Sequence, residues 1–241
     1  MSTLLQLAGL CKSFGALRVI DNLALDIAEG EVVGILGPNG AGKSTMFGLI
    51  AGELRPSAGS IRFLDRDITA LPAHARCRLG IGRSYQIPRP FGHMTVFENL
   101  LVGAAFGARR GETASYALCV DILDRTGLAG KANSAARTLT LLERKRLELA
   151  RALATAPRIL LLDEIAGGLT ESECGELIQT IKAVHAAGTT IVWIEHVVHA
   201  LLAVVERLVV IDFGRKLADG EPEAVLRNPA VQAVYMGMAE A

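Results

Sequence analysis

A glycine-rich loop between an apolar strand and a helix constrains this chain more than any other feature of its sequence. Residues 37–45 read GPNGAGKST, which fits the pattern GxxxxGK[ST]. Glycines at these positions let backbone N–H groups turn inward around phosphate oxygens, and the following helix adds the positive end of its dipole. The run EVVGIL before the loop and STMFGLIAG after it supply the strand and helix that the motif requires. The alternative, a glycine-rich turn without a ligand, is therefore disfavoured.

This loop predicts a set of nucleotide contacts. Lys43 is expected to reach the β- and γ-phosphates, and the Ser44 hydroxyl is expected to ligate Mg²⁺. The residues predicted to line the nucleotide are Gly37, Pro38, Asn39, Gly40, Ala41, Gly42, Lys43, Ser44 and Thr45.

Two acidic residues end a second apolar run, ILLLDE at residues 159–164. Side chains that follow a buried strand lie at the carboxyl edge of the sheet, where open α/β sheets bind their ligands. Asp163 is suited to hold Mg²⁺ through water, and Glu164 is suited to polarise an attacking water molecule. Such a pair alone more often marks the entry to a loop, but beside the glycine-rich loop it indicates a catalytic pair.

A histidine and a glutamine follow two further strand-like runs. His196 ends the run IVWIEH, and Gln86 ends the segment Ile81–Gln86, just before Ile87 and Pro88. Beside a nucleotide, His196 can donate a hydrogen bond to the γ-phosphate, whereas a lone histidine at such a position is usually structural. Gln86 can ligate Mg²⁺ or position water, and by itself it is uninformative.

Composition argues against two classes of protein. The 25 Lys and Arg residues balance 25 Asp and Glu residues, which argues against a chain built mainly to coat nucleic acid. The chain is 51% hydrophobic with a mean hydropathy of +0.36, yet no apolar run reaches the ~18–20 residues of a membrane span. The amino terminus lacks a basic leader and the four cysteines form no CxxC pair. We therefore expect no secretory signal and no zinc or disulfide framework, and a cytoplasmic location.

Apolar and helical runs alternate along much of the chain, which predicts an α/β fold with parallel central strands covered on both faces. The expected buried strands are Glu31–Leu36, Arg158–Leu162, Thr189–Ile194 and Arg207–Ile211. The expected helices are Ser44–Ala51, Leu142–Thr155, Ser172–Ala187 and His199–Val205. An antiparallel β edge is expected from Leu4–Leu10, Leu23–Ile27 and Ser60–Phe63.

The middle of the chain contains no strong strand and reads as a helical insert. Helices are expected at Thr95–Val102 and Thr113–Thr126, separated by the Gly- and Arg-rich segment Gly103–Gly111. Thr95 and Glu98 fit a capping box, in which each side chain bonds the other residue's backbone N–H.

In this order, the glycine-rich loop, Gln86, the acid pair and His196 resemble the nucleotide-binding subunit of ABC transporters. They match that family's Walker A, Q-loop, Walker B with catalytic glutamate, and H-loop. The resemblance implies a P-loop NTPase core of the ABC type with a mixed sheet, an N-terminal antiparallel β subdomain and a helical insert. It also implies a single nucleotide-binding domain over residues 1–241, with the helical subdomain inserted at about residues 87–140.

The resemblance further implies ATP and Mg²⁺ as cofactors and assigns roles to individual residues. The catalytic residues implied are Glu164, His196 and Lys43. The metal ligands implied are Ser44, Gln86 and Asp163. Phe14, in the run KSFG, sits where the family places an aromatic ring that stacks on adenine.

Within the family, GPNGAGKST, MTVFENLLVGA, IEH and the closing run from Gly220 to Gly237 look like the ATPases of branched-chain amino acid importers. Related urea and amide importers share much of this pattern. The resemblance implies a subunit that binds and hydrolyses ATP to power such an importer from the cytoplasm, peripherally on the inner face of the cell membrane. The expected partners are a second ABC ATPase in a hetero- or homodimer, transmembrane permease subunits and, indirectly, a solute-binding protein, with no nucleic acid.

One segment departs from the family's pattern. ABC ATPases cover each ATP with the partner's signature, usually LSGGQ, and residues 139–143 here read LTLLE. Thr140 can replace the serine, but Leu142 replaces a glycine and Glu143 replaces a neutral glutamine. A carboxylate ~6 Å from one phosphate charge costs roughly 3 kcal/mol at an effective dielectric constant of ~20, so Glu143 is not expected to face ATP.

A capping box offers an alternative interpretation of the same segment. Thr140 and Glu143 have the required spacing, and the box would turn the Glu143 carboxylate back toward the Thr140 backbone. We favour this interpretation. The residues expected to face a partner's ATP remain Thr140, Leu141, Leu142 and Glu143.

Two further departures lie nearby, where Ile165 replaces a proline and Thr170 replaces the Asp or Asn of the D-loop. All these changes lie in or near parts that face the partner subunit, which favours a heterodimer whose other subunit supplies an ordinary signature. The alternative function is a nucleotide-gated binding or regulatory subunit with slow or no hydrolysis. The apolar, proline-rich segment at residues 86–94 is the expected contact with membrane subunits.

Overall fold

Two units make up the structure, a computed structural model that describes residues 2–108 and 111–236. Unit 1 comprises Met1–Ala73 and Val192–Ala241, and unit 2 comprises His74–Ile191. In the sequence, unit 2 is therefore inserted into unit 1. The helical segment expected at about residues 87–140 falls inside unit 2.

Unit 1 contains an antiparallel sheet with the strand order β2-β1-β4-β5. Its strands are β1 (Thr3–Phe14), β2 (Leu17–Ala28), β4 (Ala58–Phe63) and β5 (Arg66–Asp67). In β2, the buried residues Leu23, Leu25 and Ile27 alternate with exposed ones, as in a sheet with one face on the core. The expected antiparallel edge is confirmed. Its first two strands are longer than expected, because the pairing of β1 with β2 continues beyond Leu10 through several register shifts and ends at Phe14 and Leu17.

The other strands of unit 1 lie in the order β10-β9-β3-β8. They are β10 (Arg215–Gly220), β9 (Arg207–Asp212), β3 (Val32–Leu36) and β8 (Thr190–Ile194), the last of which begins at the end of unit 2. β3 runs parallel to β9, whereas β10 is antiparallel to it, so the expected mixture of strand directions is confirmed. Every residue of β3 and β8 is buried, as their continuous apolar sequences predicted.

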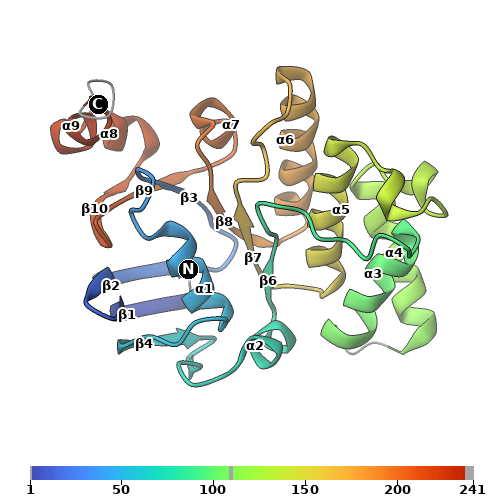
Figure 1. Cartoon of the computed structure of the whole chain (residues 1–241), viewed down its shortest axis with the longest axis horizontal. Coiled ribbons are helices and arrows are strands. Elements are labelled where there is room, and N and C mark those ends of the chain that lie inside the picture. The colour runs from blue at the N-terminus through green and yellow to red at the C-terminus, as the bar shows by residue number, and fades with distance from the viewer. Residues whose placement is uncertain (1, 109–110, 237–241) are drawn as a thin grey trace. The chain divides into compact units, whose positions relative to one another are not determined.

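The helices of unit 1 follow its strands. They are α1 (Lys43–Ala51), α7 (Val198–Leu202), α8 (Pro222–Leu226) and α9 (Pro229–Met236). The last two lie side by side near the carboxyl end of the chain (Figure 1). α7 ends three residues before the expected boundary at Val205, and the N–H groups of Val204 and Val205 both donate to the Leu201 carbonyl.

Among the residues that the structure describes, unit 2 holds one parallel strand pair and most of the helices. β6 (Ile81–Arg83) pairs with β7 (Ile159–Asp163). The helices are α2 (Ala73–Leu79), α3 (Val96–Val102), α4 (Glu112–Arg125), α5 (Leu141–Ala154) and α6 (Glu171–Ala186), with two 3₁₀ turns at Ala129–Lys131 and Ala136–Thr138. α3, α4 and α5 pack on one another (Figure 1). β6 is shorter than expected, so Gln86 lies on a loop three residues beyond it.

The segment between α3 and α4 is a π-helix over Gly103–Gly107, where the sequence predicted only a connection. A Cβ atom on Gly107 would lie 2.8 Å from the Thr155 side chain, just past the end of α5, so this turn needs a residue without a side chain. Phe106 is 70% exposed on the same turn.

Capping boxes begin three helices of unit 2. The pairs are Thr95 with Glu98, Thr140 with Glu143, and Thr170 with Glu173. The first two confirm sequence expectations. The third explains the threonine at residue 170, because its side chain accepts from the Glu173 N–H at 3.3 Å. Across residues 2–108 and 111–236, every helix is too short or too polar to pass through a bilayer.

Candidate functional site

The glycine-rich loop of unit 1 folds around the amino group of Lys43. This lysine is the first residue of α1 and is 5% exposed. Its Nζ donates to the Gly37 carbonyl at 2.6 Å and to the Pro38 carbonyl at 2.9 Å. A buried cation therefore lies beneath the loop, while Asn39 and Gly40 are exposed.

The shape of the loop depends on Gly37, whose φ is 155°. A Cβ atom at this position would lie 2.1 Å from the backbone oxygen of Ile211, in β9. The N–H of Gly214, in the turn after β9, also donates to the Ala41 carbonyl at 3.0 Å. The loop is thus pressed against β9 and its following turn, and only glycine fits at residue 37.

The N-terminus of α1 is not capped by any side chain, because Gly42 occupies the N-cap position with φ 99°. The first N–H groups of a helix lack partners inside the helix and favour an anion. Ser44, in the same first turn, is exposed. This arrangement of uncapped N–H groups, a buried lysine and a serine hydroxyl suits a phosphate group.

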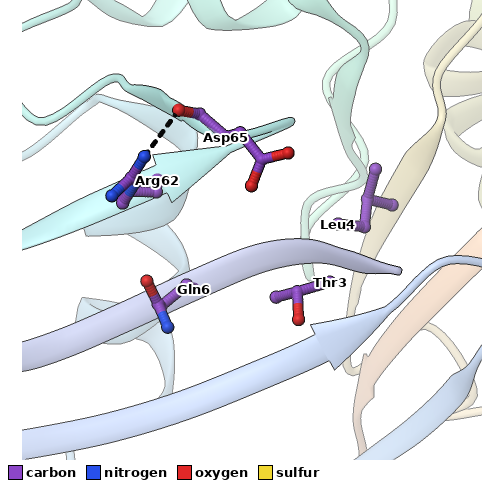
Figure 2. Close-up of a pocket in the computed structure, with 5 residues that line it drawn as sticks. All are labelled: Thr3, Leu4, Gln6, Arg62 and Asp65. Atoms are coloured by element: carbon purple, nitrogen blue, oxygen red, sulfur yellow. Dashed lines mark hydrogen bonds between the residues drawn. The ribbon is translucent and has the colours of Figure 1, made fainter. Parts of the chain in front are cut away.

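Two cavities of unit 1 differ in their relation to this loop. One of about 510 Å³ is lined by Pro38, Asn39, Gly40, Ala41, Asp212, Phe213 and Val234. Figure 2 shows the other, of about 180 Å³, lined by Thr3, Leu4, Gln6, Arg62 and Asp65, where Arg62 donates to the Asp65 carbonyl at 2.8 Å. Only the first borders residues that the sequence singled out.

His196 lies in unit 1 just after β8 and is exposed. The residue before it, Glu195, is 1% exposed, and its Oε2 accepts the N–H groups of His196 at 3.0 Å and Val197 at 3.3 Å. Glu195 therefore sets the backbone that presents the histidine. This role was not expected from the sequence, although a charged residue between a buried strand and a candidate histidine was a signal for it.

Phe14 ends β1 in the same unit and is 48% exposed. The ammonium group of Lys12 lies 4.9 Å from the centroid of its ring. The ring thus has one flank against a cation and a large exposed surface, which leaves it accessible to a planar ligand.

In unit 2, Asp163 ends β7 and is 4% exposed. Its Oδ2 lies 2.9 Å from Nη2 of Arg83, the last residue of β6. The backbone N–H of Asp163 donates to the Ser84 hydroxyl at 3.3 Å. The arginine was not expected from the sequence, because its contact with Asp163 spans 80 residues and depends on the pairing of β6 with β7.

Glu164 has a left-handed backbone, with φ 47°. Its Oε2 accepts a hydrogen bond from Nε2 of Gln86, and its carbonyl accepts one from Lys145 Nζ at 3.4 Å. Non-glycine residues in this region cost of order 1–3 kcal/mol and cluster at functional sites. The structure thus brings together Gln86 and Glu164, two residues that the sequence connected only by family resemblance.

The segment expected to act as a signature begins α5, and its glutamate is turned inward. Glu143 Oε2 accepts the Thr140 N–H at 2.9 Å, and Oε1 lies 3.1 Å from Lys131 Nζ. Leu142 is only 9% exposed, whereas Leu141 is 47% exposed. Both leucines stand where the signature pattern has a glycine, and the exposed one is Leu141, whereas Leu142 was the one expected to matter from the sequence.

The contribution of the Glu143 carboxylate to the free energy of unfolding should depend on pH. The Thr140 backbone N–H and the Lys131 ammonium keep the pKa of Glu143 below its ordinary 4.5, so its contribution is full above that pH and is lost as the pH falls through the lowered pKa. We expect the Glu143→Gln variant to be slightly less stable than wild type at pH 7, by about 0.5 kcal/mol, and the difference to shrink as the pH falls below 4.5. Urea unfolding at pH 7, 5 and 3 measures the difference, and a gap that widens on acidification would contradict it.

The candidate residues divide between the two units. Unit 1 contains Phe14, residues 37–45 and His196, and unit 2 contains Gln86, Asp163, Glu164 and residues 140–143. Each group is ordered by contacts within its own unit.

Comparison with family models gives two matches. A model described as "ABC transporter" matches residues 20–167. A second, described as "Branched-chain amino acid ATP-binding cassette transporter", matches residues 215–238.

Individual proteins show similarity over nearly the whole chain. The high-affinity branched-chain amino acid transport ATP-binding protein LivG of Salmonella typhimurium is 37% identical over 98% of each chain. The lipopolysaccharide export system ATP-binding protein LptB of Acidithiobacillus ferridurans is 36% identical, also over 98% of each chain. A crystal structure of an ABC transporter's ATP-binding cassette in its ADP conformation gives a TM-score of 0.90 at 29% identity, covering 98% of this chain and 100% of that one.

Proposed function

The chain belongs to the ABC transporter family of ATP-binding proteins, and from this we propose that it is the ATP-hydrolysing subunit of an importer for branched-chain amino acids or related small polar solutes such as urea and amides. Family membership confirms the expected fold class and the expectation of a nucleotide-binding ATPase. The observation that carries the proposal is the loop at residues 37–42, folded over the buried Lys43 at an uncapped helix N-terminus.

In the proposed reaction, this chain's residues bind the triphosphate and orient the attacking water. Lys43 and the first N–H groups of α1 hold the β- and γ-phosphates. Glu164 orients water for in-line attack on the γ-phosphate and accepts its proton, and His196 donates a hydrogen bond to that phosphate. Phe14 stacks on adenine. The remaining contacts come from the backbone and side chains of residues 37–45.

The residues proposed for Mg²⁺ offer hard oxygen donors, which that ion prefers. They are the Ser44 hydroxyl, the Asp163 carboxylate and the Gln86 amide oxygen. The chemistry fits, because Gln86 uses its Nε2 on Glu164 and its oxygen is the atom that can face a cation. Bound there, the ion would neutralise charge on the β- and γ-phosphates.

The cargo is proposed from two likenesses. Identity alone does not select it, because LivG and LptB are nearly equally similar to this chain but are named for different cargoes. The match of residues 215–238 to a branched-chain amino acid transporter model favours the amino acid. Uptake of radiolabelled leucine, urea and acetamide by vesicles containing the assembled importer tests this, and ATP-dependent uptake of none of them would reject the proposed cargo.

The proposed partners are transmembrane permease subunits, which place the chain at the cytoplasmic face of the membrane, and a second ABC ATPase. A solute-binding protein would act on the other side of the permease, without touching this chain, and nucleic acid has no role. The loop at residues 86–94 is the proposed contact with the permease. It presents Ile87, which is 66% exposed, and Phe91, which is 45% exposed.

The signature segment supports a heterodimer over a homodimer. In the proposed dimer, Thr140, Leu141, Leu142 and Glu143 face the partner's ATP. The negative charge of Glu143 repels that ATP only weakly, because the carboxylate accepts a hydrogen bond from the Thr140 N–H and is paired with the Lys131 ammonium. The exposed Leu141 would instead keep backbone N–H groups away from the phosphate, which a glycine would let approach.

We therefore expect the purified chain alone to hydrolyse ATP at least about tenfold more slowly than its complex with a partner of ordinary signature. A homodimer of the Leu141→Gly variant should recover part of the rate. Steady-state phosphate release measures all three preparations. Equal rates for the wild-type chain alone and the complex would reject the heterodimer.

A nucleotide-gated regulatory subunit is the second candidate, favoured by the altered signature. It predicts tight ATP binding, closure of the dimer and no turnover in any assembly. Measurable hydrolysis in the complete complex, abolished by a substitution of Glu164, excludes it.

A further inference from the structure

The loop that carries Gln86 is fastened to α5 by a buried glutamate. Glu148 lies in the second turn of α5 and is 4% exposed. The backbone N–H groups of Arg89 and Tyr85, one on each side of Gln86, act to lower the pKa of its carboxyl and so favour the charged form. A carboxylate with two backbone donors on one loop fixes the path of that loop.

Arg151, one turn further along α5, completes the attachment. Its Nη1 lies 3.1 Å from Glu148 Oε2 and donates to the Arg89 carbonyl at 2.9 Å. Its guanidinium carbon lies 5.1 Å from the centroid of the Phe91 ring. The charged pair therefore holds both the backbone and a side chain of the loop.

The far end of the same loop is held independently by Asn99 of α3, which is 1% exposed. Its Oδ1 accepts the Phe91 N–H at 2.8 Å, and its Nδ2 donates to the Phe91 carbonyl at 3.1 Å. Gln86 and Ile87, between these attachments, are exposed. The loop is thus anchored at its ends while its centre is presented outward.

Burying the carboxylate of Glu148 destabilises the folded state, so the presence of a glutamate at this position needs a structural reason. Desolvation raises the pKa of its carboxyl, so at neutral pH the charged form is less favourable in the fold than in the unfolded chain. An apolar residue in this part of α5 would avoid that cost. The structural reason is that the carboxylate orders the two backbone N–H groups of the loop and the guanidinium of Arg151.

We propose that Glu148 and Arg151 are positioning residues for ATP hydrolysis, which fix the Gln86 loop to the helix that begins at the signature segment. The inference rests on the proposed role of Gln86 and Glu164, and it adds that the geometry of this pair is set from α5. A change at the signature end of α5 is then transmitted to Gln86 and to the exposed Ile87.

The test is a double-mutant cycle in the complex of the chain with its permease and second ATPase. Glu148→Gln keeps the shape of the side chain but removes its charge. We expect it to lower kcat for ATP hydrolysis about tenfold or more, with KM changed less than about twofold. In a Gln86→Ala background the same substitution should change kcat less than about twofold, because the positioned group is gone.

Hydrogen–deuterium exchange supplies a readout that is independent of activity. Amides in residues 85–91 should exchange faster in Glu148→Gln, while nucleotide affinity and the urea midpoint remain near wild type. Glu176→Gln is the matched control, because Glu176 lies on α6 and its ion pair, at 2.6 Å, is with Arg146 of α5 rather than with the loop. Arg151→Lys replaces Glu148→Gln if the latter does not fold.

Equal losses of kcat with and without Gln86, or unchanged exchange of residues 85–91, would overturn the positioning role. A wild-type complex that does not hydrolyse ATP would instead reject the proposed function. In that case the hydrogen–deuterium exchange of residues 85–91 alone supports or overturns the anchoring of the Gln86 loop by Glu148 and Arg151.

Discussion

Replacing Glu164 with glutamine should lower ATP turnover by about 10²–10⁴-fold, the usual contribution of a positioned general base. The amide has nearly the same shape and can still accept the hydrogen bond from Gln86, so the local geometry is retained. It cannot take a proton from water. Nucleotide affinity should remain within about threefold of wild type, because the proposed phosphate contacts come from Lys43 and α1.

Single-turnover hydrolysis and equilibrium binding of ATP separate these two effects. Glu176 is an exposed glutamate of α6, and the Glu176→Gln variant controls for the loss of one carboxylate from unit 2. Wild-type hydrolysis by Glu164→Gln would remove this residue from the mechanism. A parallel loss of ATP affinity would mean that Glu164 acts in binding instead.

Replacing Gly37 with alanine should destabilise the protein by about 3 kcal/mol or more, because the new Cβ meets a backbone oxygen that cannot move alone. That atom is the Ile211 oxygen of β9, 2.1 Å from the position a Cβ would take. Relief requires the loop to leave β9, which would also remove the cradle around Lys43. The melting temperature should fall by roughly 6 °C or more, and ATP binding should be lost even where the variant is folded.

Gly40→Ala provides the matched comparison for stability. Gly40 also has a positive φ, 81°, but no heavy atom lies within 4 Å of a Cβ placed there. It should cost only about 1 kcal/mol, from the left-handed backbone. Thermal unfolding of the two variants without nucleotide measures the difference, and equal melting temperatures would show that the contact with Ile211 is not limiting.

Local patterns in this chain were sufficient to predict most of its elements. The apolar runs became β3, β7, β8 and β9 within one or two residues, because a run buried on both faces has little choice of conformation. Two capping boxes were predicted correctly because each involves side chains only three residues apart. The π-helix at Gly103–Gly107 was missed because it depends on close approach to residue 155, far along the chain.

The candidate site was predictable in its residues but not in their partners. The loop at residues 37–45 carries its own chemistry, since glycines, a lysine and a helix start all lie within nine positions. The contacts of Asp163 with Arg83, and of the Gln86 loop with Glu148, join residues that are far apart in sequence. Nothing in a linear pattern distinguishes such a largely covered arginine or a buried glutamate from a solvated one.

The sequence by itself thus determined the family, the nucleotide-binding loop and the order of the strands and helices along the chain. These follow from spacings that local backbone geometry enforces. Tertiary structure alone decided that Leu141 rather than Leu142 is exposed at the start of α5, and which side chains of α5 and α3 contact the loop that carries Gln86. The physical reason is that burial and pairing of charges are set by packing between α5, the Gln86 loop and β7, and this packing exists only once the chain has folded.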